Sequence, residues 1–382
     1  MQKSSLWGTV SAYVFSLGFI ASANAASFIP MGDIPDHFES DGYGVSADGT
    51  VAVGHAATTI PGTNELDHWP FRWTLKDGMV NLGLLSDTST YASAVQTSAD
   101  GSVITGTNTY ANGDREAFRW TATTGIEGLG TLPGEDRPRS EATDITSDGS
   151  VIVGRLTGIG TFGSFIWTTA DGMMQIGGEI HVNAISGNAS YLVGEKFGIG
   201  SGAYLWTQDG GVITSEVFLG PGFAHDVSSD GSVVVGLAPI GVNDLFEGFR
   251  WTLEDGMTSL GTFGGEPGSD ALGVSADGSV VVGVGRNADD EDVAFIWDET
   301  NGIQSLQDVL TGLGVNLDGW DLQYAFDVSA DGSVIVGYGD NPDGIREAWI
   351  ANLTPIPIPP AFFLFGSGLV GLIGIARRKK SI

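Results

Sequence analysis

The sequence contains no cysteine, so disulfide bridges, thiolate metal sites and a cysteine nucleophile are all excluded. Basic residues are also scarce: 16 Lys and Arg stand against 46 Asp and Glu, and the formal net charge is −30. A chain with so few cations cannot neutralise many phosphates, which argues against nucleic acid as a partner. Charged residues make up only 16% and hydrophobic residues 42%, which is the composition of a globular protein.

A sustained helical period is missing as well, and the chain is instead rich in turn residues. Its 59 glycines are roughly twice the usual share, and no Gly-X-Y period accompanies them, which excludes collagen. We therefore expect many tight turns between short strands.

Residues 1–25 have the organisation of a secretory signal peptide. Lys3 provides the positive start, Leu6–Ile20 the apolar run, and Ala23-Asn24-Ala25 a small-x-small cleavage site. A membrane anchor is the alternative, but the apolar run is short and interrupted by glycine and serine. The sequence thus predicts export across the inner membrane.

The other end, residues 355–382, combines a proline run, an uncharged apolar stretch over 361–376 and a basic stop. As a helix, the apolar stretch would span about 24 Å, slightly short of the ~30 Å hydrocarbon core, and the proline run makes it just long enough. Basic residues stay on the cytoplasmic side, so everything upstream would lie outside. The stop consists of Arg377, Arg378, Lys379 and Lys380.

This tail resembles a sorting signal of the PEP-CTERM type, in the variant usually written VPLPA. The resemblance rests on Pro357, Ile358, Pro359, Pro360 and Ala361, followed by Gly366, Ser367 and Gly368. It implies an exosortase that removes the tail in a Gram-negative bacterium making exopolysaccharide. The glutamate of the commonest motif is absent, and a plain membrane anchor remains the alternative. Contact with the inner membrane through the C-terminal helix would then be transient, and the protein secreted or held at the cell surface.

Between the two ends, residues 26–354 carry one unit repeated seven times with a period of about 47 residues. A Ser-(Ala/Ser)-Asp-Gly-(Ser/Thr)-Val-x-Val-Gly phrase alternates with an aromatic-x-Trp phrase and a phrase ending near Leu-Gly. The Asp-Gly pairs begin at Asp48, Asp100, Asp148, Asp230, Asp277 and Asp331, with a degenerate copy at Asn188. The tryptophans are Trp73, Trp120, Trp167, Trp206, Trp251, Trp297 and Trp349.

Each unit predicts four short strands, which in the third copy are residues 142–146, 150–154, 164–168 and 173–177. Asp-Gly pairs supply the positive φ of two-residue hairpin turns, and the strands are β-branched or aromatic. Four antiparallel strands at this period are typical of a β-propeller blade. We therefore predict an all-β, seven-bladed β-propeller.

The seventh unit ends after Leu353 and has no fourth strand, while residues 28–33 match the fourth-strand phrase without a unit of their own. We predict that this N-terminal strand completes the last blade and closes the ring. The repeat also resembles the extracellular HAF repeats of bacterial secreted proteins over residues 40–350. That resemblance implies architecture and location, because the family carries no agreed activity.

Residues with catalytic or metal-binding spacing are hard to find. Residues 158–163 match GxGxxG but lie between strands, GxSxG and HExxH are absent, and the five histidines lack ligand spacing, so we expect no cofactor. Turn chemistry accounts for the Asp-Gly aspartates, and the framework tryptophans are expected to pack between blades. An acidic run is expected to be a solvated loop, with weak calcium binding as the alternative: Asp289, Asp290, Glu291 and Asp292.

The longest departures from the repeat, residues 55–70 and 307–324, each contain a tryptophan outside the framework, Trp69 and Trp320. Tryptophan faces and carboxylates together suit a sugar polymer, so we predict a ligand-binding patch there. The alternative is that both indoles cap the blade ends, since large aromatic residues are usually buried. The other members of the predicted patch are Asp67, His68, Asp318, Asp321 and Tyr324.

These observations favour a non-enzymatic, secreted or cell-surface propeller that interacts with extracellular matrix or exopolysaccharide. A propeller-type glycan lyase or hydrolase is the first alternative, and a membrane-anchored surface sensor is the second. An enzyme is expected to carry symmetry-breaking polar residues on its inner strands, and the first strands of the repeats are mostly small or aliphatic. His181 and His225 are the exceptions.

Overall fold

A computed structural model describes residues 26–35, 37–59, 66–132, 139–158, 162–241, 245–263 and 268–354. The predicted signal peptide, the whole sorting tail with its basic stop, and residues 159–161 of the GxGxxG match lie outside the described residues. Ala26–Thr354 form one compact unit. Within the described ranges, no helix has the length and apolar character needed to cross a bilayer.

The unit consists of seven four-stranded antiparallel blades, as the repeats predict. The first three blades are β2 (Glu39–Val45), β3 (Val51–Thr59), β4 (Leu66–Thr74), β5 (Gly78–Asn81); β6 (Ser89–Thr97), β7 (Val103–Tyr110), β8 (Arg115–Thr121), β9 (Gly125–Gly128); and β10 (Ser140–Ile145), β11 (Val151–Leu156), β12 (Gly163–Thr168), β13 (Gly172–Ile176). The next three are β14 (Ile180–Ile185), β15 (Tyr191–Lys196), β16 (Gly202–Asp209), β17 (Val212–Gly220); β18 (Phe223–Val227), β19 (Val233–Pro239), β20 (Phe246–Thr252), β21 (Gly256–Ser259); and β22 (Ser269–Val274), β23 (Val280–Arg286), β24 (Asp292–Asp298), β25 (Gly302–Ser305). The seventh contains β26 (Asp321–Val328), β27 (Val334–Asp340), β28 (Arg346–Asn352) and β1 (Ser27–Pro30).

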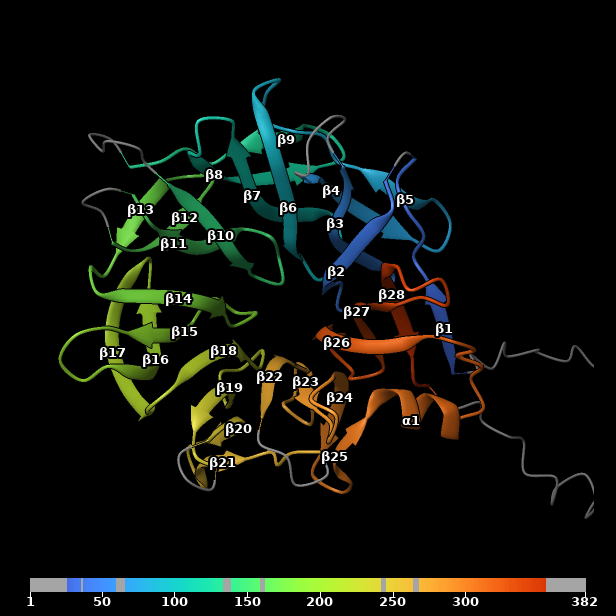
Figure 1. Cartoon of the computed structure of the whole chain (residues 1–382). Helices are drawn as coiled ribbons and strands as arrows, with labels where there is room; N and C mark the ends of the chain where they lie inside the picture. The colour runs from blue at the N-terminus through green and yellow to red at the C-terminus, as the bar shows by residue number, and fades with distance from the viewer. Residues whose placement is uncertain are drawn as a thin grey trace, which may run out of the picture. The chain divides into compact units, whose positions relative to one another are not determined.

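The blades close into a ring around a central channel (Figure 1). The innermost strands are β2, β6, β10, β14, β18, β22 and β26, and each contacts the innermost strand of both neighbours, with β26 returning to β2. One parallel bridge, between His68 and Tyr91, also links the first blade to the second. The central channel is therefore lined by the first strand of every repeat.

The N-terminal strand closes the ring, which confirms the predicted clasp. β1 pairs with β28 antiparallel, in a register that places Ser27 opposite Asn352 and Pro30 opposite Trp349 (Figure 1). The ring of Phe28 stands edge-on to Trp320 at 5.0 Å between centroids. Met31 is buried in the interface between the seventh and first blades. The clasp thus combines backbone pairing with apolar packing on both faces of the blade.

The Ser-x-Asp-Gly phrase forms the loop between the first and second strands of each blade. Ser98 Oγ donates to Asp100 Oδ1 at 2.8 Å and accepts from Val103 N at 3.0 Å, and Asp100 Oδ1 accepts from Ser102 N at 3.0 Å. Residues 98–102 separate the strands, so the predicted two-residue turn is wrong. Only Gly101 has positive φ, because the aspartate acts through its side chain instead.

The glycine that ends the phrase allows the second strand to approach the first. A Cβ on Gly106 would lie 2.0 Å from Ser93 O and 2.6 Å from Phe118 Cζ. The same position in the other blades is Gly54, Gly154, Gly194, Gly236, Gly283 and Gly337, each with an inner-strand carbonyl oxygen at 1.8–2.1 Å. Only glycine fits this crossing, which explains its recurrence.

The framework aromatic residues pack between blades, as expected. Trp206 and Trp349 are among the largest fully buried side chains, and Phe71, Phe118, Phe165, Phe249 and Phe295 are fully buried too. Hydrophobic clusters join residues of adjacent blades, so stacking buries both faces of each sheet.

The structure contains one element that the sequence did not predict. This is the helix α1 (Leu306–Gly312) between the sixth and seventh blades. Ser305 caps it by accepting from Asp308 N, and Leu306 and Leu310 are fully buried against the seventh blade. The segment has only about two amphipathic turns, which is too short for a helical period to show in the sequence.

Candidate functional site

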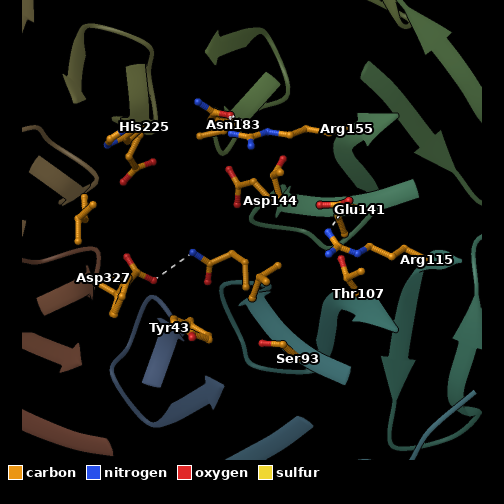
Figure 2. Close-up of a pocket in the computed structure, with 18 of the residues that line it drawn as sticks. Tyr43, Ser93, Thr107, Arg115, Glu141, Asp144, Arg155, Asn183, His225 and Asp327 are labelled. Atoms are coloured by element: carbon orange, nitrogen blue, oxygen red, sulfur yellow. Dashed lines mark hydrogen bonds and ion pairs between the residues drawn. The ribbon is translucent and has the colours of Figure 1, made fainter. Parts of the chain in front are cut away.

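Every innermost strand carries a β-bulge at the same place in the repeat. The ladder with the second strand skips one residue in each blade, for example Thr143 between Ala142 and Asp144. The skipped residues are Tyr43, Val95, Thr143, Asn183, His225, Leu272 and Phe326. All of them line one cavity of about 690 Å³ at the wide end of the channel, which we call the mouth (Figure 2). A bulge re-aims a side chain, and here seven bulges aim at the same space.

The opposite end of the channel, which we call the neck, is narrow and built from the repeated phrase. Its cavity is only about 130 Å³. Backbone N–H groups donate to the carbonyl of the next blade around the axis, as from Ala47 to Ala99 at 3.0 Å and from Ala99 to Ser147 at 2.9 Å. The last such bond returns from Ala330 to Ala47. The loop between the first and second strands of every blade lies on this face, together with the turn between the third and fourth strands of the first six blades, because both hairpins of an antiparallel blade point the same way.

Side chains at the mouth and directly beside it differ from blade to blade, although the backbone there repeats. Two residues before each bulge the blades carry Asp41, Ser93, Glu141, His181, Phe223, Asp270 and Tyr324. The cross-strand partners are His55, Thr107, Arg155, Glu195, Leu237, Val284 and Tyr338. Since equivalent positions share one geometry, the fold does not dictate these side chains. The mouth is therefore the place where the molecule is free to carry a specific site.

One wall of the mouth is polar and hydrogen-bonded. Arg115 Nη1 lies 2.8 Å from Glu141 Oε1, and Arg155 donates to Asn183 Oδ1. Asn183 Nδ2 in turn donates to Glu195 Oε2 at 2.7 Å. These charge-assisted bonds hold the side chains of this wall in place (Figure 2).

The other wall, over the seventh, first and second blades, is a continuous belt of aromatic rings. Tyr43 stands edge-on to Phe326 at 4.9 Å between centroids, and Tyr324 stacks on Tyr338 at 4.8 Å. His55, His68 and Tyr91 extend the belt, with 4.5 Å between the two imidazoles and 4.6 Å from His68 to Tyr91. Tyr43, Tyr91 and Phe326 line the mouth itself.

Three aspartates mark the floor of the mouth, one residue beyond the bulge in the third, fifth and seventh blades. Asp226 Oδ1 accepts from Val227 N at 2.7 Å, and its Oδ2 accepts from Val274 N of the next blade at 2.8 Å. Asp144 and Asp327 bridge to their next blades in the same way. Small residues occupy the blades between them, and Gln96 fills the second blade, donating to Asp327 Oδ2 at 3.1 Å. Because the ring has an odd number of blades, aspartates and small residues cannot alternate all the way around it, and Gln96 occupies the remaining position.

Burial raises the pKa values of these carboxyls. The pKa of Asp226 rises to about 7 through burial and the charge of Asp327, and that of Asp144 rises well above its usual range through burial and the charge of Asp226. Burial also raises the pKa of Asp41 to about 6 and lowers that of His55 to about 3. The turn aspartates shift the other way, because serine hydroxyls and backbone N–H groups bond to their ionised form. Their pKa values are lowered at Asp100, Asp148, Asp230, Asp277 and Asp331.

These opposite shifts predict a stability maximum in mild acid. A carboxyl whose pKa is raised by folding stabilises the fold below its unfolded pKa near 4 and loses that effect as pH rises through about 7. A carboxyl whose pKa is lowered by folding stabilises the fold above its unfolded pKa, and this stabilisation is lost as the pH falls further. His55 opposes the first trend, but the raised carboxyls outnumber it. Urea unfolding should therefore give a higher free energy of unfolding at about pH 5 than at about pH 8, and a lower one below about pH 4. In Asp226→Asn, the difference between about pH 5 and about pH 8 should be smaller. A steady decline from pH 8 downward would contradict this.

The structure divides the predicted tryptophan patch among several places. Trp69 and Trp320 are both half-buried and pack against different hydrophobic clusters. The cluster at Trp320 lies between the sixth and seventh blades, and the one at Trp69 between the seventh and first. The stretches assigned to loops are partly regular, because Asp67, His68 and Trp69 lie in β4, and Asp321 and Tyr324 lie in β26. Two members, His68 and Tyr324, belong to the aromatic belt. Asp318 accepts a hydrogen bond from Asn316 at the surface. Sugar binding by the tryptophans themselves stays a prediction.

The acidic run forms the hairpin turn between β23 and β24. Arg286 Nη1 lies 2.7 Å from Asp290 Oδ1, and Arg286 Nε lies 3.4 Å from Asp292 Oδ1. Asn287 donates to Glu291 Oε2 at 3.0 Å, while Asp289 N donates to Asn287 Oδ1. In the described part of the chain, no group of three histidine or acidic side chains is placed to hold a metal ion.

Sequence reasoning missed most of the mouth. It identified His181 and His225, of which His225 lines the mouth, with its Nδ1 3.1 Å from Asp270 Oδ1. His181 lies outside the lining, with its Nδ1 3.4 Å from Glu195 Oε1. Glu141 and Arg155 were overlooked because the predicted strands did not extend to them, and Asn183 because the bulge that aims it at the mouth was not predicted. An alignment of the seven units by their Asp-Gly pairs would have shown one variable column between two constant ones.

No protein-family model matches the chain, and no curated protein is similar to it in sequence. Solved structures share its fold. The β-propeller domain of the Trilobed protease from Pyrococcus furiosus, described as having an open velcro topology, aligns with a TM-score of 0.54 at 12% identity, over 86% of this chain and 98% of that one. Puromycin hydrolase aligns with a TM-score of 0.52 at 13% identity, over 80% of this chain and 51% of that one. TolB from Acinetobacter baumannii aligns with a TM-score of 0.44 at 12% identity, over 66% of this chain and 62% of that one. This chain thus spans less than two thirds of TolB and about half of puromycin hydrolase, and the likeness shows the β-propeller fold alone.

Proposed function

We propose that the protein is a non-enzymatic, exported binding module that takes the end of a hydroxyl-rich polymer, an exopolysaccharide, into the mouth of its central channel. The observation that carries the proposal is the contrast between the two ends of the channel. Repeated small residues form the neck, whereas the mouth presents a different side chain from each blade around about 690 Å³. Pockets of this size accommodate small organic ligands.

A sugar is the ligand class that suits the two walls. The aromatic belt offers ring faces to the apolar C–H side of a pyranose, and Tyr43 and Phe326 line the mouth directly. Opposite them, Asn183, Arg155 and Glu141 offer donors and acceptors for hydroxyl groups. Because the neck is narrow, the polymer would enter by its end rather than pass through.

The path of the chain suits display of the mouth to the outside. β28 ends on the neck face, where Leu353 N donates to Ser333 O at 2.7 Å, and β1 begins beside it. The last described residues therefore lie on the face opposite the mouth, which leaves the mouth accessible.

A plug in the mouth tests the proposal. Leu272 occupies the bulge of the sixth blade and lines the cavity, so Leu272→Trp should fill the space without removing a hydrogen bond. We expect at least a tenfold loss of affinity, about 1.4 kcal/mol, for the saccharide that the purified full chain binds best in a glycan screen. The matched control is Leu253→Trp, since Leu253 is 86% exposed in a turn on the neck face.

Equal binding by both variants would refute the mouth as the site, provided that both unfold at the wild-type temperature. Mass spectrometry of the saccharide after incubation tests the non-enzymatic part. An intact saccharide is expected, and a shortened or unsaturated product would favour the glycan lyase or hydrolase instead.

A further inference from the structure

The floor of the mouth has unused acceptor capacity on two alternate blades. Asp144 accepts from Ile145 N and from Ile185 N, each at 2.7 Å, and Asp226 accepts two backbone N–H groups in the same manner. A carboxylate has about four lone-pair sites, so each group retains about two. The blade between them presents only the methyl group of Ala184 at the equivalent position. Space and acceptors therefore coincide above Ala184.

Among the described residues, no lysine or arginine pairs with these carboxylates, and the imidazole of His225 beside Asp226 is bonded to Asp270. The two arginines of the mouth are engaged higher up, Arg115 with Glu141 and Arg155 with Asn183 and Glu195. None of the ion pairs in the described residues includes a carboxylate of the floor. The wider field has the same sign, because residues 26–354 hold 46 acidic residues and 11 basic ones. Such a field repels anionic sugars and attracts cationic ones.

We propose that the ligand of the mouth carries a primary ammonium group, as in an amino sugar, and that this group lies above Ala184 between Asp144 and Asp226. The ammonium supplies three donors to the free lone pairs, and its charge offsets the like charges that surround it. The aromatic wall of the same cavity, Tyr43 and Phe326, stacks on the sugar ring. This inference rests on the proposed function, because it assigns the sugar class to the same site.

Binding of three tetrasaccharides to the purified full chain tests the inference: a glucosamine oligomer, its N-acetylated form and a galacturonic acid oligomer. Isothermal titration calorimetry at about 0.15 M salt, where the Debye length is about 8 Å, limits attraction to the general surface charge. We expect at least a tenfold preference for the glucosamine oligomer over the N-acetylated one.

Two variants of the fifth blade separate the floor from the surface. Asp226→Asn should weaken the glucosamine oligomer about tenfold and leave the N-acetylated oligomer within twofold. Asp255→Asn removes a carboxylate of the same blade that accepts from Thr252 Oγ1 in a turn of the neck face, and it should change neither affinity. Asp144→Asn repeats the first test from the neighbouring side, should Asp226→Asn unfold.

The outcomes distinguish this inference from the proposed function. Equal binding of the neutral and amino oligomers, both blocked by Leu272→Trp, would overturn the amino-sugar assignment and leave the mouth as the site. Tightest binding of the galacturonic acid oligomer would overturn it as well. Glucosamine binding that survives the Leu272→Trp plug would mark a non-specific surface interaction and would overturn both.

Discussion

Deletion of residues 26–34 should lower the unfolding temperature by about 10 °C or more. The deletion removes all of β1 with its four pairs to β28, and it exposes the faces against which Phe28, Met31 and Ile34 pack. Loss of a buried Met or Ile side chain costs about 2 kcal/mol or more, so several kcal/mol are at stake. One kcal/mol corresponds to about 2 °C in a domain of this size. Differential scanning calorimetry measures the change.

Two single-residue variants help to interpret the effect of that deletion on the unfolding temperature. Phe28→Ala should lower the midpoint measurably, because its ring contacts both Trp320 and Trp349. Ile199→Ala should leave the midpoint unchanged, since that side chain is 99% exposed. An unaltered midpoint after the deletion would show that the ring holds without its clasp.

Gly283→Ala should destabilise the sixth blade by about 3 kcal/mol or more, although it adds a single methyl group. The new Cβ would lie 2.0 Å from Asp270 O and 2.8 Å from Phe295 Cε1, so the first and second strands must separate. Separation weakens the hydrogen-bond ladder between β22 and β23, which includes the bulge at Leu272. The lining of the mouth at Leu272 should therefore change as well. Urea unfolding gives the free energy of unfolding for this variant.

Gly302→Ala in the same blade is the matched control. Gly302 has a φ of +68° in the last turn, and no atom lies within 4 Å of the position of its Cβ. It should cost only the penalty of the left-handed conformation, about 1–2 kcal/mol. If the two variants lose the same stability, steric crossing of the strands is not the reason for the repeated glycine.

Much of the fold could be predicted because the same strand and turn pattern recurs in each of the seven repeats. The Asp-Gly and aromatic-x-Trp phrases mark two hairpins in each unit, and an orphan strand phrase at one end matches a missing strand at the other. The loop between the first two strands was mispredicted, because the aspartate was assumed to act through its backbone. In the structure, Asp100 bonds through its carboxylate and only Gly101 takes the left-handed conformation.

The candidate site was largely beyond such reasoning, since it consists of what the repeats do not share. In the third unit, the first strand was predicted to begin at residue 142 and the second to end at residue 154. In the structure, β10 begins at Ser140 and β11 continues to Leu156. Glu141 and Arg155 lie in these two extensions. A bulge also interrupts the two-residue alternation of a strand, so alternation alone assigns Thr143 to the wrong face. Ring geometry, which brings seven such positions to one cavity, appears only when the blades are assembled.

The central claim is that the mouth of the channel holds the ligand, and a crystal structure of the protein with its best-bound saccharide tests it most directly. The account predicts a sugar ring between Tyr43 and Asn183, with its polar groups toward Asp144 and Asp226. A saccharide bound instead beside Trp320, on the neck face or on the outer strands, with the mouth filled only by water, would contradict it.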